Sequence, residues 1–264
     1  MRHLLSIFTV SFLGLASAAL WAETEEADFL TEDDLLDDEF MDRVDIPDPL
    51  EPLNRVIFTV NDFVYLQVVD PVANAYTTVV PDPIERGLGN FFRNLRYPIR
   101  FVSNVAQGDF TSARIESERF IVNTTVGIGG FMSPADNIEG LERLPSQNIA
   151  SALGAHGMGE GFYLVLPLLG PTTTRDALGI LGNRTVSPWH IPYTVIDEQN
   201  IRIGLDVGEF LNSSSSLVEG YRSVVENAFD PYSSVKNGFV QSQRQHIRPL
   251  GFASANHIVR ERRR

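Results

Sequence analysis

Apolar residues recur at helical spacing from Leu53 onward, three and four positions apart, which is the spacing of one helix face. The members of this first stripe are Leu53, Val56, Ile57, Val60, Phe63 and Val64. At about 100° per residue, a second apolar ridge lies away from the first. It consists of Phe58, Tyr65 and Val69. A helix with two apolar ridges is either buried deeply in protein or faces a second apolar medium, and the pattern leaves both interpretations open.

Proline, glycine and asparagine-serine clusters divide the rest of the chain into short predicted helices. The predicted helices are 53–69, 70–80, 83–92, 99–106, 110–124, 172–181, 200–211, 216–228 and 231–248. In 110–124 the predicted apolar stripe is Phe110, Ala113, Ser117, Phe120, Ile121 and Thr124. Asp70-Pro71 is expected to start a new helix, and the run 212–216 to separate two others.

A glycine-dense segment precedes the apolar run Phe162–Leu169. Its glycines are Gly154, Gly157, Gly159 and Gly161. Glycines at alternate positions are typical of a bent hairpin or a flexible lip. Clean two-residue alternation is otherwise scarce, so the fold class is predicted as mainly α: a single domain of short, Pro/Gly-interrupted amphipathic helices.

The N-terminus has the layout of a secretory signal peptide. Arg2 and His3 precede an apolar run that ends in small residues, with possible cleavage after Ala18 or Ala22. A retained N-terminal anchor is the alternative, because the apolar run is almost long enough to span a bilayer. The body itself contains no run of 18 apolar residues. The predicted organisation is a signal peptide (1–22), an acidic flexible segment (23–47), the body (48–248) and a basic tail (249–264).

The charge distribution argues against a nucleic-acid partner. The formal net charge is −13, but 12 acidic residues and one arginine lie in 23–45. Residues 46–264 hold 22 acidic and 19 basic residues, so the body is almost neutral. A nucleic-acid binder needs a basic surface to neutralise phosphates.

Catalytic motifs are missing from the sequence. The chain has no cysteine, no Gly-x-Ser-x-Gly, no His-Glu-x-x-His and no phosphate-binding loop, and its five histidines are not at metal-ligand spacing. We therefore expect no enzyme activity, catalytic residue, cofactor or metal. Arg175-Asp176 is either an ordinary helix pair or a functional ion pair at a pore.

Several motifs, in this order, resemble those of the MlaA/VacJ family. They are Asp48-Pro49-Leu50-Glu51 with Asn54-Arg55, Asp70-Pro71, Pro81-Asp82-Pro83, Gly89–Leu95, Gln107-Gly108-Asp109, Arg119–Thr124, Gly127–Phe131, Leu153-Gly154, Gly157–Gly161, Leu166-Pro167, Arg175-Asp176 and Asp230-Pro231-Tyr232. Each motif alone is weak, but their shared order covers 48–246. The resemblance implies a helical ring in the inner leaflet of the outer membrane, with a central amphipathic channel.

The resemblance also implies a function and partners. Members of the family remove mislocalised phospholipid from the outer membrane, associate with a trimeric porin, and pass the lipid to a periplasmic carrier of the MlaC type. The lipid channel or gate is accordingly expected at Phe58, Asn61, Gly157, Gly159, Gly161, Arg175 and Asp176. The three glycines are interpreted as its hinge. Phe58 and Asn61 match the position of the family's inner-leaflet restraint.

One feature departs from the family pattern, because most members carry a lipobox cysteine after the signal and this chain has no cysteine. Attachment is then expected from an apolar rim, a porin or a retained N-terminal helix. Two other functions stay open on the sequence: a soluble periplasmic lipid-binding or porin-associated adaptor protein, and a hydrolase with a site assembled from distant residues.

Overall fold

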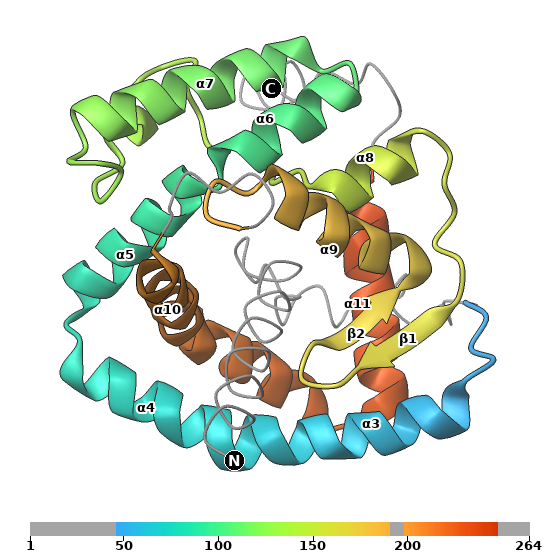
Figure 1. Cartoon of the computed structure of the whole chain (residues 1–264). Coiled ribbons are helices and arrows are strands. Elements are labelled where there is room, and N and C mark those ends of the chain that lie inside the picture. The colour runs from blue at the N-terminus through green and yellow to red at the C-terminus, as the bar shows by residue number, and fades with distance from the viewer. Residues whose placement is uncertain (1–45, 191–197, 248–264) are drawn as a thin grey trace. The chain divides into compact units, whose positions relative to one another are not determined.

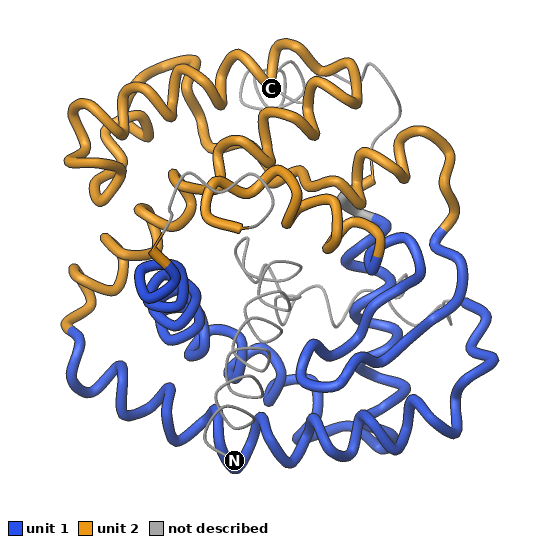
Figure 2. Tube along the Cα trace, viewed as in Figure 1, with its two compact units in different colours: residues 1–80, 160–177, 199–245 blue, residues 81–159, 178–198, 246–264 orange. Residues whose placement is uncertain are grey.

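The computed structural model describes residues 46–190 and 198–247, which are mainly helical (Figure 1). The predicted mainly α class is therefore confirmed. The chain divides into two compact units, and each unit draws on several stretches of sequence (Figure 2). Unit 1 comprises residues 1–80, 160–177 and 199–245, and unit 2 comprises 81–159, 178–198 and 246–264. The predicted signal peptide and nearly all of the acidic segment and basic tail lie outside the described residues.

Unit 1 is built around a long helix in three parts: α3 (Glu51–Val64), the π-helical η2 (Tyr65–Val69) and α4 (Asp70–Val79). A hairpin of β1 (Tyr163–Leu166) and β2 (Gly170–Thr173) packs against α3. The unit also contains α10 (Gln199–Val225) and α11 (Pro231–His246) up to residue 245. The helix α9 (Thr174–Val186) begins in unit 1 and continues in unit 2.

The helix does not break at Pro71, contrary to the expectation that a new helix starts there. Proline lacks an N–H group, and its ring clashes with the carbonyl four residues earlier in a regular helix. The wider π-helical turn of η2 comes just before Pro71, and the Asp70 N–H donates to the Tyr65 carbonyl five residues back. As a result, Glu51–Val79 is one helix of 29 residues.

This helix is about 44 Å long at 1.5 Å per residue. Among the described residues it is the one helix that is long and apolar enough to cross a membrane, judged by length and composition. The sequence contains no uninterrupted run of 18 apolar residues in the body, and by that criterion no helix of the body is expected to cross a membrane. Individual polar residues interrupt the stretch without lowering its overall apolar character.

The hairpin strands are antiparallel, with Tyr163 opposite Thr173 and Leu166 opposite Gly170. Leu168 in the turn has φ 66°, in the left-handed region that bulky residues rarely adopt. The prediction of a helix from Thr172 is wrong, because Thr172 and Thr173 pair with β1 and α9 begins at Thr174.

Two apolar clusters form the core of unit 1. The first consists of Ile46, Tyr163, Val165, Tyr232, Phe239 and Val240. The second consists of Tyr65, Val69, Val218, Tyr221 and Val235. Phe58 packs against both clusters, so this half-buried ring joins them.

Unit 2 contains α5 (Asp82–Leu95), α6 (Tyr97–Ala106), α7 (Phe110–Thr125), a 3-10 turn η3 (Pro134–Asn137) and α8 (Ile149–Ala155). Asp109 caps α7 as expected, because its carboxylate accepts a hydrogen bond from the Ser112 N–H at 3.0 Å. A capping box between Asn148 and Ser151 starts α8.

The predicted break between two helices at 212–216 is wrong, because α10 is continuous over 27 residues. The serines in this run bond to carbonyls of their own helix. Ser213 donates to the Glu209 carbonyl at 2.7 Å, and Ser214 to the Leu211 carbonyl at 2.8 Å. Serine hydroxyls satisfied in this way do not compete with the helix, so the cluster does not act as a loop.

Candidate functional site

The long helix of unit 1 exposes apolar side chains and buries polar ones. Its exposed apolar residues include Leu53, Val56, Val60, Phe63, Val68, Val72 and Val79. Phe63 is 63% exposed, whereas Asn54 and Asn61 on the same helix are 1% and 2% exposed. The second ridge, with Tyr65 and Val69, lies in the core. The sequence left two interpretations of the double ridge, burial within the protein and contact with a second apolar medium. Burial accounts for the second ridge, and an apolar medium outside the protein accounts for the exposed stripe.

The same inversion occurs in α7 of unit 2. Its buried face carries Ser112, Glu116, Arg119 and Asn123, together with Ala113 and Ile115. Phe110 and Ile121 are 68% and 58% exposed. The predicted stripe of this helix is therefore not its buried face as a whole, since Ala113 is buried while Phe110 and Ile121 are exposed, and ion pairs satisfy the charged groups on the buried side. Glu116 accepts from Arg100 at 2.9 Å, and Arg119 pairs with Asp136.

Asn54 and Asn61 are buried because they hydrogen-bond to the hairpin backbone. The Asn54 amide donates to the Tyr163 carbonyl at 3.2 Å and accepts from the Val165 N–H at 3.0 Å. The Asn61 amide donates to the Leu166 carbonyl at 2.8 Å and accepts from the Leu168 N–H at 2.7 Å. Asn54 thus pairs with a donor and an acceptor on the outer edge of β1, as a neighbouring strand would, and Asn61 pairs with the last residue of β1 and with the turn that follows it.

Tyr65 completes this attachment one turn further along the helix. Its hydroxyl donates to the Leu168 carbonyl at 3.0 Å. Leu168, the residue with the left-handed backbone, is therefore held through its N–H by Asn61 and through its carbonyl by Tyr65. These contacts stabilise a conformation that costs free energy by itself. We call Asn54, Asn61 and Tyr65 the hairpin clamp.

The structure brings only some of the predicted site residues together. Asn61 belongs to the hairpin clamp. Phe58 is three residues away and packs between the two apolar clusters, edge-on to Tyr232 with ring centroids 5.7 Å apart. Arg175 and Asp176 follow directly after β2.

The three predicted hinge glycines lie where the chain passes from unit 2 to unit 1, between residues 159 and 160. Gly157 and Gly161 have φ of 87° and 77°, which favour glycine, while Gly159 has an ordinary backbone. A Cβ at Gly161 would lie 2.7 Å from the Thr174 side chain, so glycine is also required there by space.

Arg175 and Asp176 are both buried, with side-chain exposures of 2% and 5%. The Arg175 Nε lies 3.5 Å from Asp176 Oδ1, too far for a good hydrogen bond. The other Asp176 oxygen accepts from the Thr173 hydroxyl at 2.6 Å. Burial raises the pKa of Asp176, while the Thr173 hydrogen bond and the Arg175 charge lower it less.

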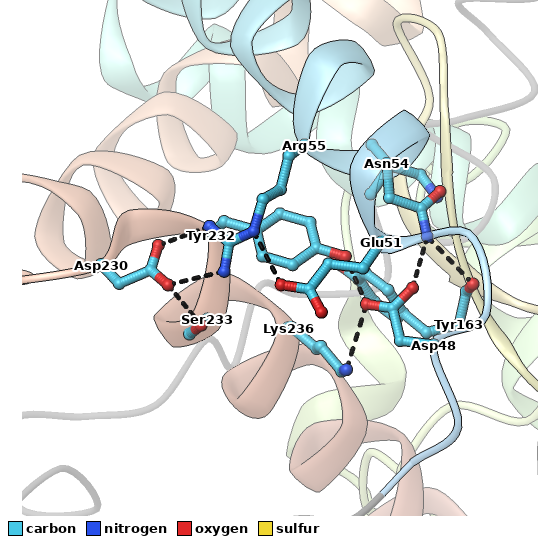
Figure 3. A network of polar contacts seen from close by, with 10 residues as sticks. Asp48, Glu51, Asn54, Arg55, Tyr163, Asp230, Tyr232, Ser233 and Lys236 are labelled. Carbon is cyan, nitrogen blue, oxygen red and sulfur yellow. Dashed lines mark hydrogen bonds and ion pairs between the residues drawn. The ribbon is translucent and has the colours of Figure 1, made fainter.

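The residues of the first motif, to which the sequence pattern gives no role, join α3 to α11 in the structure (Figure 3). Arg55 donates to both carboxylate oxygens of Asp230, at 3.0 and 2.9 Å, and lies 4.3 Å from the centre of the Tyr232 ring. Asp48 accepts from Asn54 at 2.8 Å, from Lys236 at 3.1 Å and from the Tyr232 hydroxyl. The motif is thus structural, although no spacing rule links residues 175 positions apart.

Each charged group of this network has a bonded partner. Within residues 46–190 and 198–247, no group of three or more His, Cys, Asp or Glu side chains has the geometry to hold a metal. Helices that bury polar groups and expose apolar ones define the chain as a helical protein of the membrane–water interface.

Comparisons with known proteins give the family. The MlaA lipoprotein family model matches residues 46–246. The intermembrane phospholipid transport system lipoprotein MlaA of Escherichia coli (strain K12) is 38% identical over 198 residues, covering 74% of this chain and 76% of that protein. The Shigella flexneri protein of the same name is 31% identical with the same coverage.

A solved structure from work on the maintenance of bacterial outer membrane lipid asymmetry is also similar. Its TM-score is 0.63 at 30% identity, and the match covers 75% of this chain and 98% of that one. The chain belongs to the MlaA lipoprotein family. The resemblance inferred from the ordered motifs is thereby confirmed.

Proposed function

We propose that this protein transports phospholipid between membranes, removing mislocalised phospholipid from the outer membrane and so maintaining its lipid asymmetry. The observation that carries the proposal is the exposed apolar face of the helix Glu51–Val79, whose buried asparagines, Asn54 and Asn61, hydrogen-bond to the hairpin. Such a surface is stable in a lipid leaflet and costly in water. The name of the Escherichia coli relative, an intermembrane phospholipid transport lipoprotein, supports the same function.

In this proposal the predicted site residues form a gated, amphipathic path for lipid. Phe58 and Asn61 restrain the hairpin from the side of α3, and Gly157, Gly159 and Gly161 act as its hinge. Arg175 and Asp176 supply the polar groups that a lipid headgroup needs. The clamp contacts of Asn61 and the left-handed backbone of Gly157 and Gly161 support these roles.

The proposal includes partners and a location. The protein lies in the periplasmic leaflet of the outer membrane, exported by a signal peptide and held without a lipidated cysteine. It associates with a trimeric outer-membrane porin and hands phospholipid to a periplasmic carrier of the MlaC type. It carries out no reaction and needs no cofactor or metal. The Escherichia coli relative is named as a lipoprotein of a phospholipid transport system, and this name supports a transport role rather than a catalytic one.

Purification from the bacterial envelope in mild detergent, followed by mass spectrometry, tests the proposal. We expect phospholipid and a porin to co-purify, with a mature N-terminus at Ala19 or Glu23. A lipid-free protein that stays in solution without detergent would favour the soluble adaptor instead. An intact Met1 terminus in the inner-membrane fraction would contradict the outer-membrane location.

A further inference from the structure

Arg175 is a buried cation with little compensation. Its side chain is 2% exposed, and its Nε is buried without a hydrogen bond. Taking a guanidinium out of water is costly unless hydrogen bonds and an opposite charge replace the lost hydration. The cost at Arg175 therefore calls for a partner group that completes its contacts.

Asp176 is a poor partner for this charge. Its Oδ1 also lies buried without a hydrogen bond, 3.5 Å from the Arg175 Nε, and its Oδ2 is engaged by Thr173. Burial raises the pKa of Asp176, so its charged form is disfavoured. No second carboxylate reaches Arg175 within ion-pair distance in the parts of the chain that the structure describes.

Another buried arginine, Arg100 in unit 2, shows what full compensation looks like in this protein. It donates to Glu116 at 2.9 Å and to the Arg93 carbonyl at 2.8 Å. A guanidinium presents five donors in a planar fork that fits two oxygens of a phosphate or carboxylate. The Arg175 fork has no such pair of acceptors among the described residues.

We propose that Arg175 binds the phosphate group of a phospholipid. The inference rests on the proposed function and deepens it by assigning the headgroup contact. The phosphodiester supplies two oxygens at the distance of the guanidinium fork. Arg175 is also the second residue of α9, and the positive end of a helix of 13 residues adds to the attraction for an anion.

A backbone hydrogen bond connects Arg175 to the glycine-dense segment. The Arg175 N–H donates to the Glu160 carbonyl at 3.3 Å, and the Glu160 carboxylate pairs with Arg244 at 2.8 Å. Glu160 lies between Gly159 and Gly161, so a change in the backbone at these glycines moves the residue that accepts the Arg175 backbone hydrogen bond. Hinge and phosphate contact are thereby linked through Glu160.

Calorimetric titration of the full chain in mild detergent tests the inference. The probes are dihexanoyl phosphatidylglycerol, dihexanoylglycerol without phosphate, and inorganic phosphate. We expect the Arg175→Gln variant to bind the phospholipid at least about tenfold more weakly, about 1.4 kcal/mol, with dihexanoylglycerol binding unchanged. Arg175→Lys, which keeps the charge and loses the fork, is expected to fall between the two.

Asp176→Asn distinguishes a binding site from a structural ion pair. Because Asp176 is a poor partner for Arg175, we expect this variant to bind phospholipid at least as tightly as the wild type. If the variant loses as much affinity as Arg175→Gln, the pair only supports the fold, and the inference is wrong. This variant keeps the test decisive even if Arg175→Gln fails to fold.

Arg222→Gln is the matched control, because it removes another arginine of unit 1 that pairs with Asp70. Equal phospholipid affinity of the Arg175→Gln and Arg222→Gln variants would overturn the inference. A further contrary outcome is that inorganic phosphate binds as tightly as the phospholipid and depends equally on Arg175. That result would identify a site for free phosphate and would exclude the phospholipid headgroup as its ligand. If the protein binds phospholipid through Arg175 but does not restore lipid asymmetry in cells, the result counts against the proposed function and not against the Arg175 site.

Discussion

Asn54 provides, from a helix, the hydrogen bonds that a neighbouring strand would give to β1, and Asn61 provides the same pair of bonds at the turn of the hairpin. Each fits because its amide carries a donor and an acceptor at the spacing of adjacent backbone groups. The two residues are seven positions apart, about two helical turns, so both amides point to the same side of α3. Their burial therefore follows from the hairpin, which the residue pattern of α3 alone does not reveal.

Asn61→Ala removes two hydrogen bonds and leaves the Leu168 N–H without its acceptor. We expect a loss of about 1–3 kcal/mol in unfolding free energy and faster hydrogen exchange at Leu168. Exchange measured by mass spectrometry checks the second point. Asn74→Ala, on the exposed face of α4, is the control and is expected to leave Leu168 exchange unchanged.

Asp230 makes the free energy of unfolding depend on pH. Its bonds to Arg55 and Ser233 hold the pKa of this carboxyl well below its usual range. A lowered folded-state pKa stabilises the fold above the unfolded value of about 3.9, and the stabilisation is lost as pH falls toward the folded value. Urea unfolding should show the wild type more stable than Asp230→Asn at pH 7, with the gap shrinking below about pH 4. A gap independent of pH would contradict this assignment.

At the scale of helices and strands, the helix Glu51–Val79 combines one exposed apolar face with clamp residues on its buried face. Its continuity depends on the π-helical turn before Pro71. The exposed face is the surface that the proposed function places in lipid, and its stability in water is limited by that exposure.

Val56→Glu with Phe63→Glu tests the apolar face. Both side chains are more than 60% exposed, so circular dichroism should show an unchanged fold. Flotation with phospholipid vesicles should fall at least about tenfold, because each charge opposes insertion into the leaflet. Thr59→Glu, at an exposed polar position, is the matched control. Unchanged flotation of the double variant would exclude this face as the membrane contact.

The sequence predicted the start of α7 at its capping residue Asp109, and it predicted the mainly α class. It failed where tertiary contacts decide. The serines of α10 read as a loop until their bonds to Glu209 and Leu211 are seen. Thr172 read as a helix start because hairpin pairing has no local signal in two short strands.

The candidate site was predictable in part for the same reason. The family motifs located Asn61 and Arg175, yet spacing along the chain does not connect Asn61 with Leu168 or Arg55 with Asp230. The polar buried face of α7 was missed because apolar periodicity indicates a core face only when water surrounds the protein. An apolar medium reverses that rule.

At the scale of the whole molecule, the glycine-dense segment lies where the chain passes from one compact unit to the other. Gly157 has φ 87° with open space around it, so a Cβ there meets no atom but strains the backbone. Rigidity at this point is expected to affect transport more than stability.

Gly157→Pro fixes φ near −65° and excludes the observed backbone conformation. We expect a loss of lipid transport in cells, measured as surface-exposed phospholipid, with the protein still present in the envelope. Gly159→Ala, which needs no positive φ, is the control and should transport normally. Normal lipid asymmetry with Gly157→Pro would refute the hinge.

The most direct test of the central claim is the amount of phospholipid on the cell surface of a bacterium that lacks its own MlaA. A headgroup-specific label that does not cross the outer membrane measures it. The account predicts that expression of this chain lowers surface phospholipid to the wild-type level, while the Val56→Glu, Phe63→Glu variant does not. Surface phospholipid that stays high, with the protein present in the outer membrane, would contradict the claim of phospholipid transport.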